Sequence, residues 1–140
     1  MGRFRFSLER VLEIRTSQES AAAARLAAAN AQLSSCRTDL EGTLDDLRAL
    51  QEDASRGSVD PSLAHRIASG LRQRISSTRR ETEVKQLEVS RAADSWRQAC
   101  RQKDLLEKLR KARHGEHQRV QQRLQELALD EWAVQRRHDP

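Results

Sequence analysis

The residues of this chain best suited to chemistry are two histidines three positions apart, His114 and His117, with Glu116 between them. On a helix this spacing puts both imidazoles on one face, where they could share a metal ion with a carboxylate. The pattern is not the H-E-x-x-H arrangement of zinc peptidases, no third ligand is supplied nearby, and Gly115 loosens the geometry. We therefore expect solvated histidines on a basic helix face, with no metal site and no cofactor.

The two cysteines, Cys36 and Cys100, are far apart in sequence. They form neither a disulfide framework nor the repeated C-x-x-C spacing of a zinc site. The chain also lacks a glycine-rich phosphate loop, a G-x-S-x-G nucleophile motif and a pair of acids set in a pocket. We expect that it is not an enzyme, because two packed helices offer no concavity that would exclude water from a catalytic group.

The composition is that of a protein made of long helices. Only 3% of the residues are aromatic, 36% are hydrophobic and 34% are charged, and the mean hydropathy is −0.85. Such a chain has too little bulky apolar material for a layered globular core. We predict an all-α protein that is stabilised along a narrow seam.

The first half of the chain carries a heptad pattern. Apolar or small residues recur at spacings of three and four, namely Leu26, Ala29, Leu33, Cys36, Leu40, Thr43, Leu47 and Leu50. This spacing is typical of the a and d positions of a coiled coil. It predicts a first helix over about residues 7–54.

The one clear interruption spans residues 55–60. Gly57 suits a left-handed helix stop, and Asp60 followed by Pro61 suits a helix start. A second seam begins with Leu63, Ile67, Leu71 and Ile75 and continues to Val134, with polar stretches at residues 78–85 and 110–117. We predict a second helix over about residues 61–137 and a single coiled-coil domain over residues 1–140.

A short connection between long helices predicts an antiparallel hairpin. With the turn near Ser58, facing residues have numbers that add to about 116. Leu8 and Leu12 then face the leucines of residues 105–109, and Trp96 faces the small residues 21–24, large against small. Cys36 falls too far from Cys100 for a disulfide between them.

The second helix overhangs the first by roughly 30 residues, because the first helix begins near Ser7, which this register places opposite about Leu109. The overhang keeps an apolar seam of Val120, Leu124, Leu127, Leu129, Trp132 and Val134. An isolated helix of this length is marginal in water unless its apolar face is buried. We expect the overhang to dock into a partner, with Trp132 either a packing residue or a binding anchor.

The net charge is +5, and from Ser55 onward 19 basic residues stand against 12 acids. This balance allows a basic nucleic-acid-binding coil, but bases and acids alternate along the helix and no nucleic-acid-binding motif is present. A self-associating structural coil is a further alternative. We expect a salt-bridged helix face and no nucleic acid.

Two features of the sequence bear on membrane association. No segment approaches the roughly 18 apolar residues of a transmembrane helix, and the start lacks a secretory apolar core, so we expect a cytoplasmic protein. Residues 3–12 could form a basic amphipathic anchor, but a short lead into the first helix explains them more simply.

Four segments resemble the FliJ family of flagellar export proteins. They are Phe4-x-Phe6-x-Leu8-x-x-Val11-Leu12-x-Ile14-Arg15, Ser95-Trp96-Arg97, Leu106-Glu107-Lys108-Leu109 and Leu129-Asp130-Glu131-Trp132-Ala133. The resemblance implies a non-enzymatic part of the flagellar type III export apparatus, similar to the central stalk of a rotary ATPase and serving motility. The stalk of a virulence type III secretion system shares this fold and is an alternative.

The resemblance also implies partners and the residues that bind them. The partners are the hexameric export ATPase, the cytoplasmic domain of the export gate and export chaperones. The protein would lie in the cytoplasm and peripherally at the inner membrane. We expect it to be a monomer or weak dimer. The expected ATPase-binding residues are Phe4, Phe6, Leu8, Leu124, Leu127, Asp130, Glu131 and Trp132. The expected gate-binding residues are Leu44, Leu47, Leu71 and Ile75.

Overall fold

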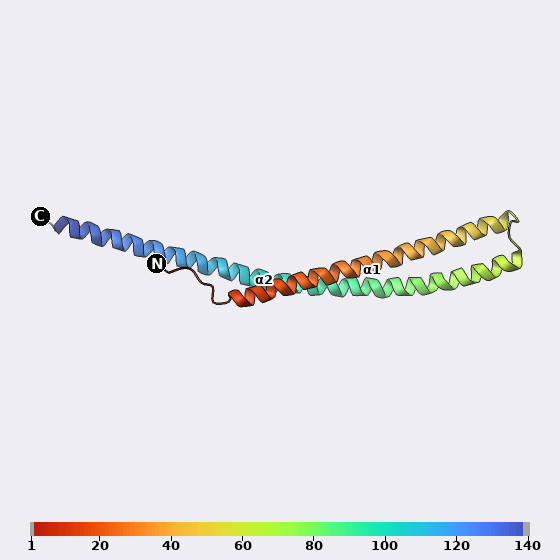
Figure 1. Ribbon diagram of the computed structural model, residues 1–140, viewed down its shortest axis with the longest axis horizontal. Helices are drawn as coiled ribbons and strands as arrows, with labels where there is room; N and C mark the ends of the chain where they lie inside the picture. Colours follow the sequence, from red (N-terminus) through yellow and green to blue (C-terminus); the bar gives the residue numbers. More distant parts are fainter. Residues whose placement is uncertain (1, 139–140) are drawn as a thin grey trace. The chain divides into compact units, whose positions relative to one another are not determined.

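Two long α-helices make up the protein in a computed structural model that describes residues 2–138 (Figure 1). Helix α1 spans Glu9–Ser55 and helix α2 spans Pro61–His138. The described part is 91% helical and contains no strand, and the two helices pack against each other. The prediction of an all-α helical hairpin is therefore confirmed.

The C-terminal end of α1 is closed by a Schellman motif. The Ser58 N–H donates to the Asp53 carbonyl at 3.0 Å, and the Gly57 N–H donates to the Ala54 carbonyl at 3.2 Å. Gly57 has φ +73°, and it is the one described residue in the left-handed region. Because glycine has no Cβ, it adopts this conformation without the steric penalty that other residues meet. The α1 helix therefore stops where the sequence predicts a stop.

Helix α2 begins directly after this turn. The Asp60 carbonyl accepts the first helical hydrogen bond, from the Ala64 N–H at 2.9 Å, and Pro61 occupies the first helical position. Proline is suited to this position because its missing N–H would have no partner there in any case. The reversal between the two helices thus takes only residues 56–60.

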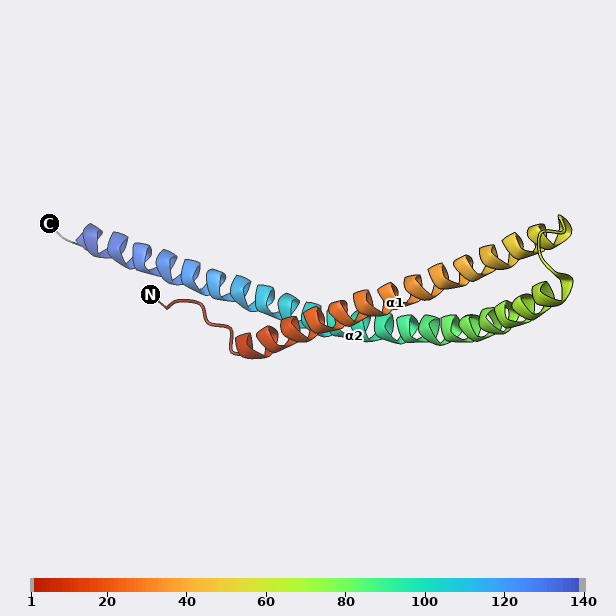
Figure 2. The ribbon, with the colours of Figure 1, turned by 45° about the vertical axis from the view of Figure 1, so that its right-hand side comes forward.

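The chain divides into two compact units, each holding part of both helices: Met1–Glu19 with Gln98–Pro140, and Ser20–Arg97. We call the first the termini unit and the second the hairpin unit. In the hairpin unit α1 and α2 run side by side in opposite directions, as Figures 1 and 2 show. The prediction of a single domain over residues 1–140 remains a prediction.

The core of the hairpin unit follows the heptad spacing. Its buried side chains are Ala22, Leu33, Cys36 and Thr43 from α1 and Ala64, Ala68 and Ile75 from α2. The one polar member, Thr43, donates its hydroxyl to the Asp39 carbonyl one helical turn earlier at 2.9 Å. Burying this hydroxyl is therefore tolerated, because its donor is satisfied within the helix.

The predicted start of the second seam was wrong. Leu63 and Ile67 are 45% and 42% exposed, whereas Ala64 and Ala68 are buried. Stepping back from Ile75 by four, three and four residues leads through Leu71 to Ala68 and Ala64, which keeps the alternating rhythm of the seam. The two larger side chains lie beside the seam rather than in it.

The middle of the α2 seam is polar, as predicted for residues 78–85. Thr78, Thr82 and Lys85 are all half-buried there. Thr82 donates to the Thr78 carbonyl at 2.8 Å, and the Lys85 ammonium donates to the Gln32 side chain of α1 at 3.1 Å. Polar contacts thus replace apolar packing in this stretch, and the Gln32–Lys85 pair lies within a few positions of the predicted register.

The termini unit is held by a small apolar core and by polar contacts between the helices. Phe6 and Leu12 are 7% and 8% exposed. Arg110 pairs with Glu9 at 3.1 Å, and Arg15 donates to Gln102 at 2.7 Å. These contacts again agree with the predicted antiparallel register.

Leu105 differs from the prediction that the leucines of residues 105–109 face Leu8 and Leu12. It is 67% exposed, whereas Leu106, Leu109 and Leu8 are half-buried and Leu12 is buried. Leu105 and Leu106 are adjacent and point in directions about 100° apart, so a narrow two-helix seam that holds Leu106 leaves Leu105 outside it. Within residues 2–138, neither helix is apolar over a stretch long enough to cross a membrane.

Candidate protein-binding surfaces

The C-terminal end of α2 is uncovered. Every residue from Gln122 to His138 is exposed, although the helix continues without a break. Six large apolar side chains between residues 120 and 134 are each more than half exposed: Val120, Leu124, Leu127, Leu129, Trp132 and Val134. We call residues 120–134 the overhang. Single exposed apolar residues are ordinary on a protein surface, but a group of this size on one helix marks a surface for a partner.

The far end of the overhang carries Trp132 beside two acids. The Arg136 guanidinium lies 4.7 Å from the centre of the indole ring, at cation–π distance. The contact leaves the indole 56% exposed, and Asp130 and Glu131 are exposed too. Trp132 is therefore not a packing residue of this chain, which leaves its other expected role, that of a binding anchor. Tryptophan is among the residue types that dominate binding energy at interfaces.

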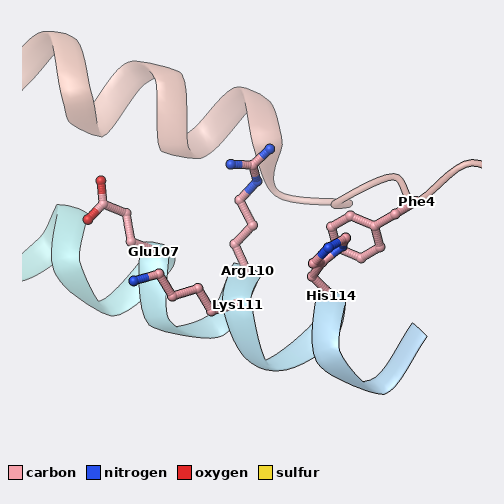
Figure 3. A pocket seen from close by; sticks show the side chains of 5 residues that line it. All are labelled: Phe4, Glu107, Arg110, Lys111 and His114. Carbon is pink, nitrogen blue, oxygen red and sulfur yellow. The ribbon is translucent and has the colours of Figure 1, made fainter. Parts of the chain in front are cut away.

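The N-terminal segment before α1 lies on α2 (Figure 3). The Phe4 ring meets His114 edge to face, with ring centres 4.7 Å apart and planes at 63°, and lies 5.6 Å from the His117 ring. His117 also hydrogen-bonds the Gly2 carbonyl at 3.2 Å, and Arg113 donates to the Ser7 hydroxyl at 3.2 Å. The two histidines therefore serve to hold this segment.

The three expected ATPase-binding residues of this segment are used by the chain itself. Phe6 is buried, while Phe4 and Leu8 are half-buried. Phe4 also lines a shallow pocket of about 470 Å³ together with Glu107, Arg110, Lys111 and His114, shown in Figure 3. The segment thus offers a partner parts of Phe4 and Leu8, and far less of Phe6. The pairing of Phe4 with His114 has no heptad signal and could not be foreseen from spacing.

A second surface lies in the hairpin unit. Leu44, Leu47 and Ile75 line one open groove of about 390 Å³, and these are three of the four residues expected to bind the gate. The fourth, Leu71, is half-buried and does not line it. The remaining lining residues are Arg72, Ser76, Arg79, Arg80 and Glu83. The arginines were not predicted, although each of Arg72 and Arg79 follows a seam residue by one position, which places it at the rim of a coiled coil.

The sequence was compared with known proteins. It matches the model of the family described as flagellar FliJ protein over residues 4–139, nearly the whole chain. The chain belongs to the FliJ family. It is thus a flagellar, export-related coiled-coil protein. No curated protein and no solved structure gave a match.

The thiols of this FliJ-family chain are not arranged for reaction. Cys36 and Cys100 are both free, and Cys36 is buried. Desolvation, and then the negative charge of Glu19, raise the pKa of the Cys100 thiol, whose sulfur lies 3.9 Å from the Glu19 carboxylate. A raised pKa lowers the fraction of thiolate, which is the nucleophilic form.

Metal binding by the FliJ-family chain finds no support in the geometry. Among residues 2–138, no three His, Cys, Asp or Glu side chains are grouped closely enough to hold an ion. His114 is in hydrogen-bonding contact with Gln118 at 3.2 Å and faces Phe4, and His117 faces Phe4 and Gly2. The two surfaces are suited to protein recognition, because each carries apolar side chains beside charged groups.

Proposed function

We propose that this chain is a non-enzymatic, stalk-like component of the flagellar export apparatus that binds the export ATPase ring through its overhang. It works in the cytoplasm, peripherally at the inner membrane, as a monomer or weak dimer. Membership of the FliJ family supports a role in flagellar export. The proposal adds the partner and the surface that binds it.

The observation that carries the proposal is the bare apolar face of the overhang. A helix with no tertiary contacts is marginal in water, and most helical stability in proteins comes from burial of an apolar face. Leu124 and Leu127 lie three residues apart, on one side of the helix, and both are exposed. A partner that covers them would gain apolar burial and order the helix in one step. The adjacent Asp130 and Glu131 suit basic groups at the edge of such a contact.

A stalk of this kind acts through binding energy. A ligand that contacts several subunits of an assembled ring, and fewer contacts in a free subunit, stabilises the ring by mass action. No catalytic group on the stalk is needed for this effect. The chain would then raise the ATPase rate by raising the fraction of assembled rings.

We assign the hairpin groove to the second partner, the cytoplasmic domain of the export gate. Leu44, Leu47 and Ile75 supply its apolar floor, and export chaperones would bind the same chain. Because the groove lies in the hairpin unit and the overhang in the termini unit, the two surfaces use different residues throughout. One chain could therefore link the ATPase to the gate.

The test combines the chain with a flagellar export ATPase and measures ring formation and hydrolysis rate. The full chain is expected to raise both, and a chain without residues 115–140 is expected to raise neither. The double change Leu124→Glu with Leu127→Glu should act like the truncation, because it puts charge on the apolar face.

The matched control is Gln122→Glu with Gln125→Glu. It adds the same two charges to the same exposed stretch and spares the leucines. It should retain the effect on both ring formation and hydrolysis. Full activity of the truncated chain, or equal loss in the control, would remove the overhang from the mechanism.

A further inference from the structure

The hairpin unit carries opposite charges on its two flanks. Asp39 and Asp46 stand one position before the seam residues Leu40 and Leu47, and Asp53 follows seven positions later. Residues at this heptad place line one flank of an antiparallel pair. Ile67, one position before the buried Ala68, has the same place on α2. We call these residues, Asp39, Asp46, Asp53 and Ile67, the acidic flank.

The other flank is basic. Arg72 and Arg79 stand one position after the seam residues Leu71 and Thr78, and Leu44 stands one position after Thr43. The structure brings all three together along the hairpin groove. Arg37 and His65 have the equivalent heptad place, and no acid has it between residues 37 and 79. We call Arg72, Arg79 and Leu44 the basic flank.

These charges are not used inside the chain. Within residues 2–138, none of the three aspartates and neither arginine forms an ion pair. All five side chains belong to exposed residues. Each flank also holds one opposing charge, Arg74 beside the aspartates by heptad place and Glu83 at the groove. One flank therefore keeps a net negative charge and the other a net positive charge, and neither charge is neutralised within one copy.

Each flank carries exposed apolar surface as well as charge. The acidic flank presents Ile67, which is 42% exposed, and the basic flank presents an open groove of about 390 Å³. Leu44, Leu47 and Ile75 line the groove floor. The aspartates and the arginines share a spacing of seven residues, about 10.5 Å along a helix, so that several pairs can form at once. An exposed isoleucine on the acidic flank is thus available to enter the apolar groove of the basic flank.

We propose that the acidic flank of one copy docks side by side on the basic flank of a second copy, where it competes with the gate domain for the hairpin groove. The interface is heterologous, because each copy contributes a different surface. A free flank therefore remains at either side of a pair, and association increases with protein concentration. An acidic segment of another protein, or a nucleic acid, would use the basic flank alone. A requirement for both flanks distinguishes a second copy from these ligands.

The test measures the molar mass of the full chain by sedimentation velocity over a range of concentrations. Salt of roughly 20 mM leaves surface charges interacting, and roughly 500 mM screens them. The mass is expected to rise with concentration in low salt and to fall toward that of a monomer in high salt.

Charge reversal then locates the interface. Arg72→Glu with Arg79→Glu makes both flanks acidic, and Asp46→Arg with Asp53→Arg makes both flanks basic. Each variant alone should lose about tenfold in association constant, since several exposed ion pairs are replaced by repulsion. An equal mixture of the two variants should associate again, because acidic flanks then meet basic ones.

The control is Arg66→Glu with Arg101→Glu, which reverses two exposed arginines at the outward heptad place. It should self-associate like the unchanged chain, and circular dichroism should show every variant to be helical. A monomer at all concentrations in low salt overturns the proposal. So does a mixture that fails to associate, a loss confined to the basic-flank variant, or an equal loss in the control.

Discussion

Ala64 and Ala68 are buried in the hairpin unit, while their bulkier neighbours Leu63 and Ile67 are not. At these positions the place in the heptad decides burial, and the size of the side chain does not. Small residues let two helices approach closely. Leu47 and Leu50, near the C-terminal end of α1, are half-buried. The contribution of an apolar residue to stability should therefore follow its place in the seam.

Two isoleucines of α2 test this directly, because they have the same side chain in different places. Ile75→Ala should destabilise the chain by about 2–4 kcal/mol, since Ile75 is 5% exposed and its removal leaves a cavity. Ile67→Ala should cost less than about 1 kcal/mol, because surface changes have small effects. Urea unfolding followed by circular dichroism measures both. Equal losses would show that the seam does not run through Ala68 and Ile75.

At the scale of the helices, spacing and helix-terminating residues predicted most of the fold. The alternation from Leu26 to Leu50 predicts α1, and Gly57 with Asp60-Pro61 predicts the reversal that the structure contains. The prediction failed where a seam had to be extended by residue type, as at Leu63 and Ile67. One helix read alone does not show which of two adjacent stripes will face the other helix.

The reversal can be tested with two glycines that should respond in opposite directions. Gly57→Ala should destabilise the chain by about 1 kcal/mol, because Gly57 is left-handed and no atom near its added Cβ would compensate. Gly70→Ala should stabilise α2 by up to about 1 kcal/mol, because Gly70 is helical and its added Cβ also meets nothing. Thermal unfolding measures both changes. A gain from Gly57→Ala would contradict the role of the Schellman motif.

At the scale of the whole molecule, the candidate surfaces were only partly visible in the sequence. Counting residues from the turn was enough to predict that α2 is longer than α1 and extends past its first residue. The groove needs both helices at once, because Leu44 and Leu47 come from α1 and Ile75 comes from α2. The contact of Phe4 with His114 depends on a non-helical segment, for which no periodic signal exists.

The uncovered end of α2 also makes the free chain vulnerable to proteases. Local unfolding of a segment without tertiary contacts costs little, and cleavage follows the population of the open form. Trypsin should therefore cut at the arginines of this end, Arg119, Arg123, Arg136 and Arg137, before it cuts after Arg66, which is equally exposed but lies where α2 pairs with α1. Mass spectrometry of a digestion time course measures this order, and a first cut after Arg66 would contradict it. Under the proposed function, a chain whose overhang is bound by its partner keeps this end, whereas an unbound chain is shortened and can no longer bind, so the overhang would set a lifetime for unassembled copies.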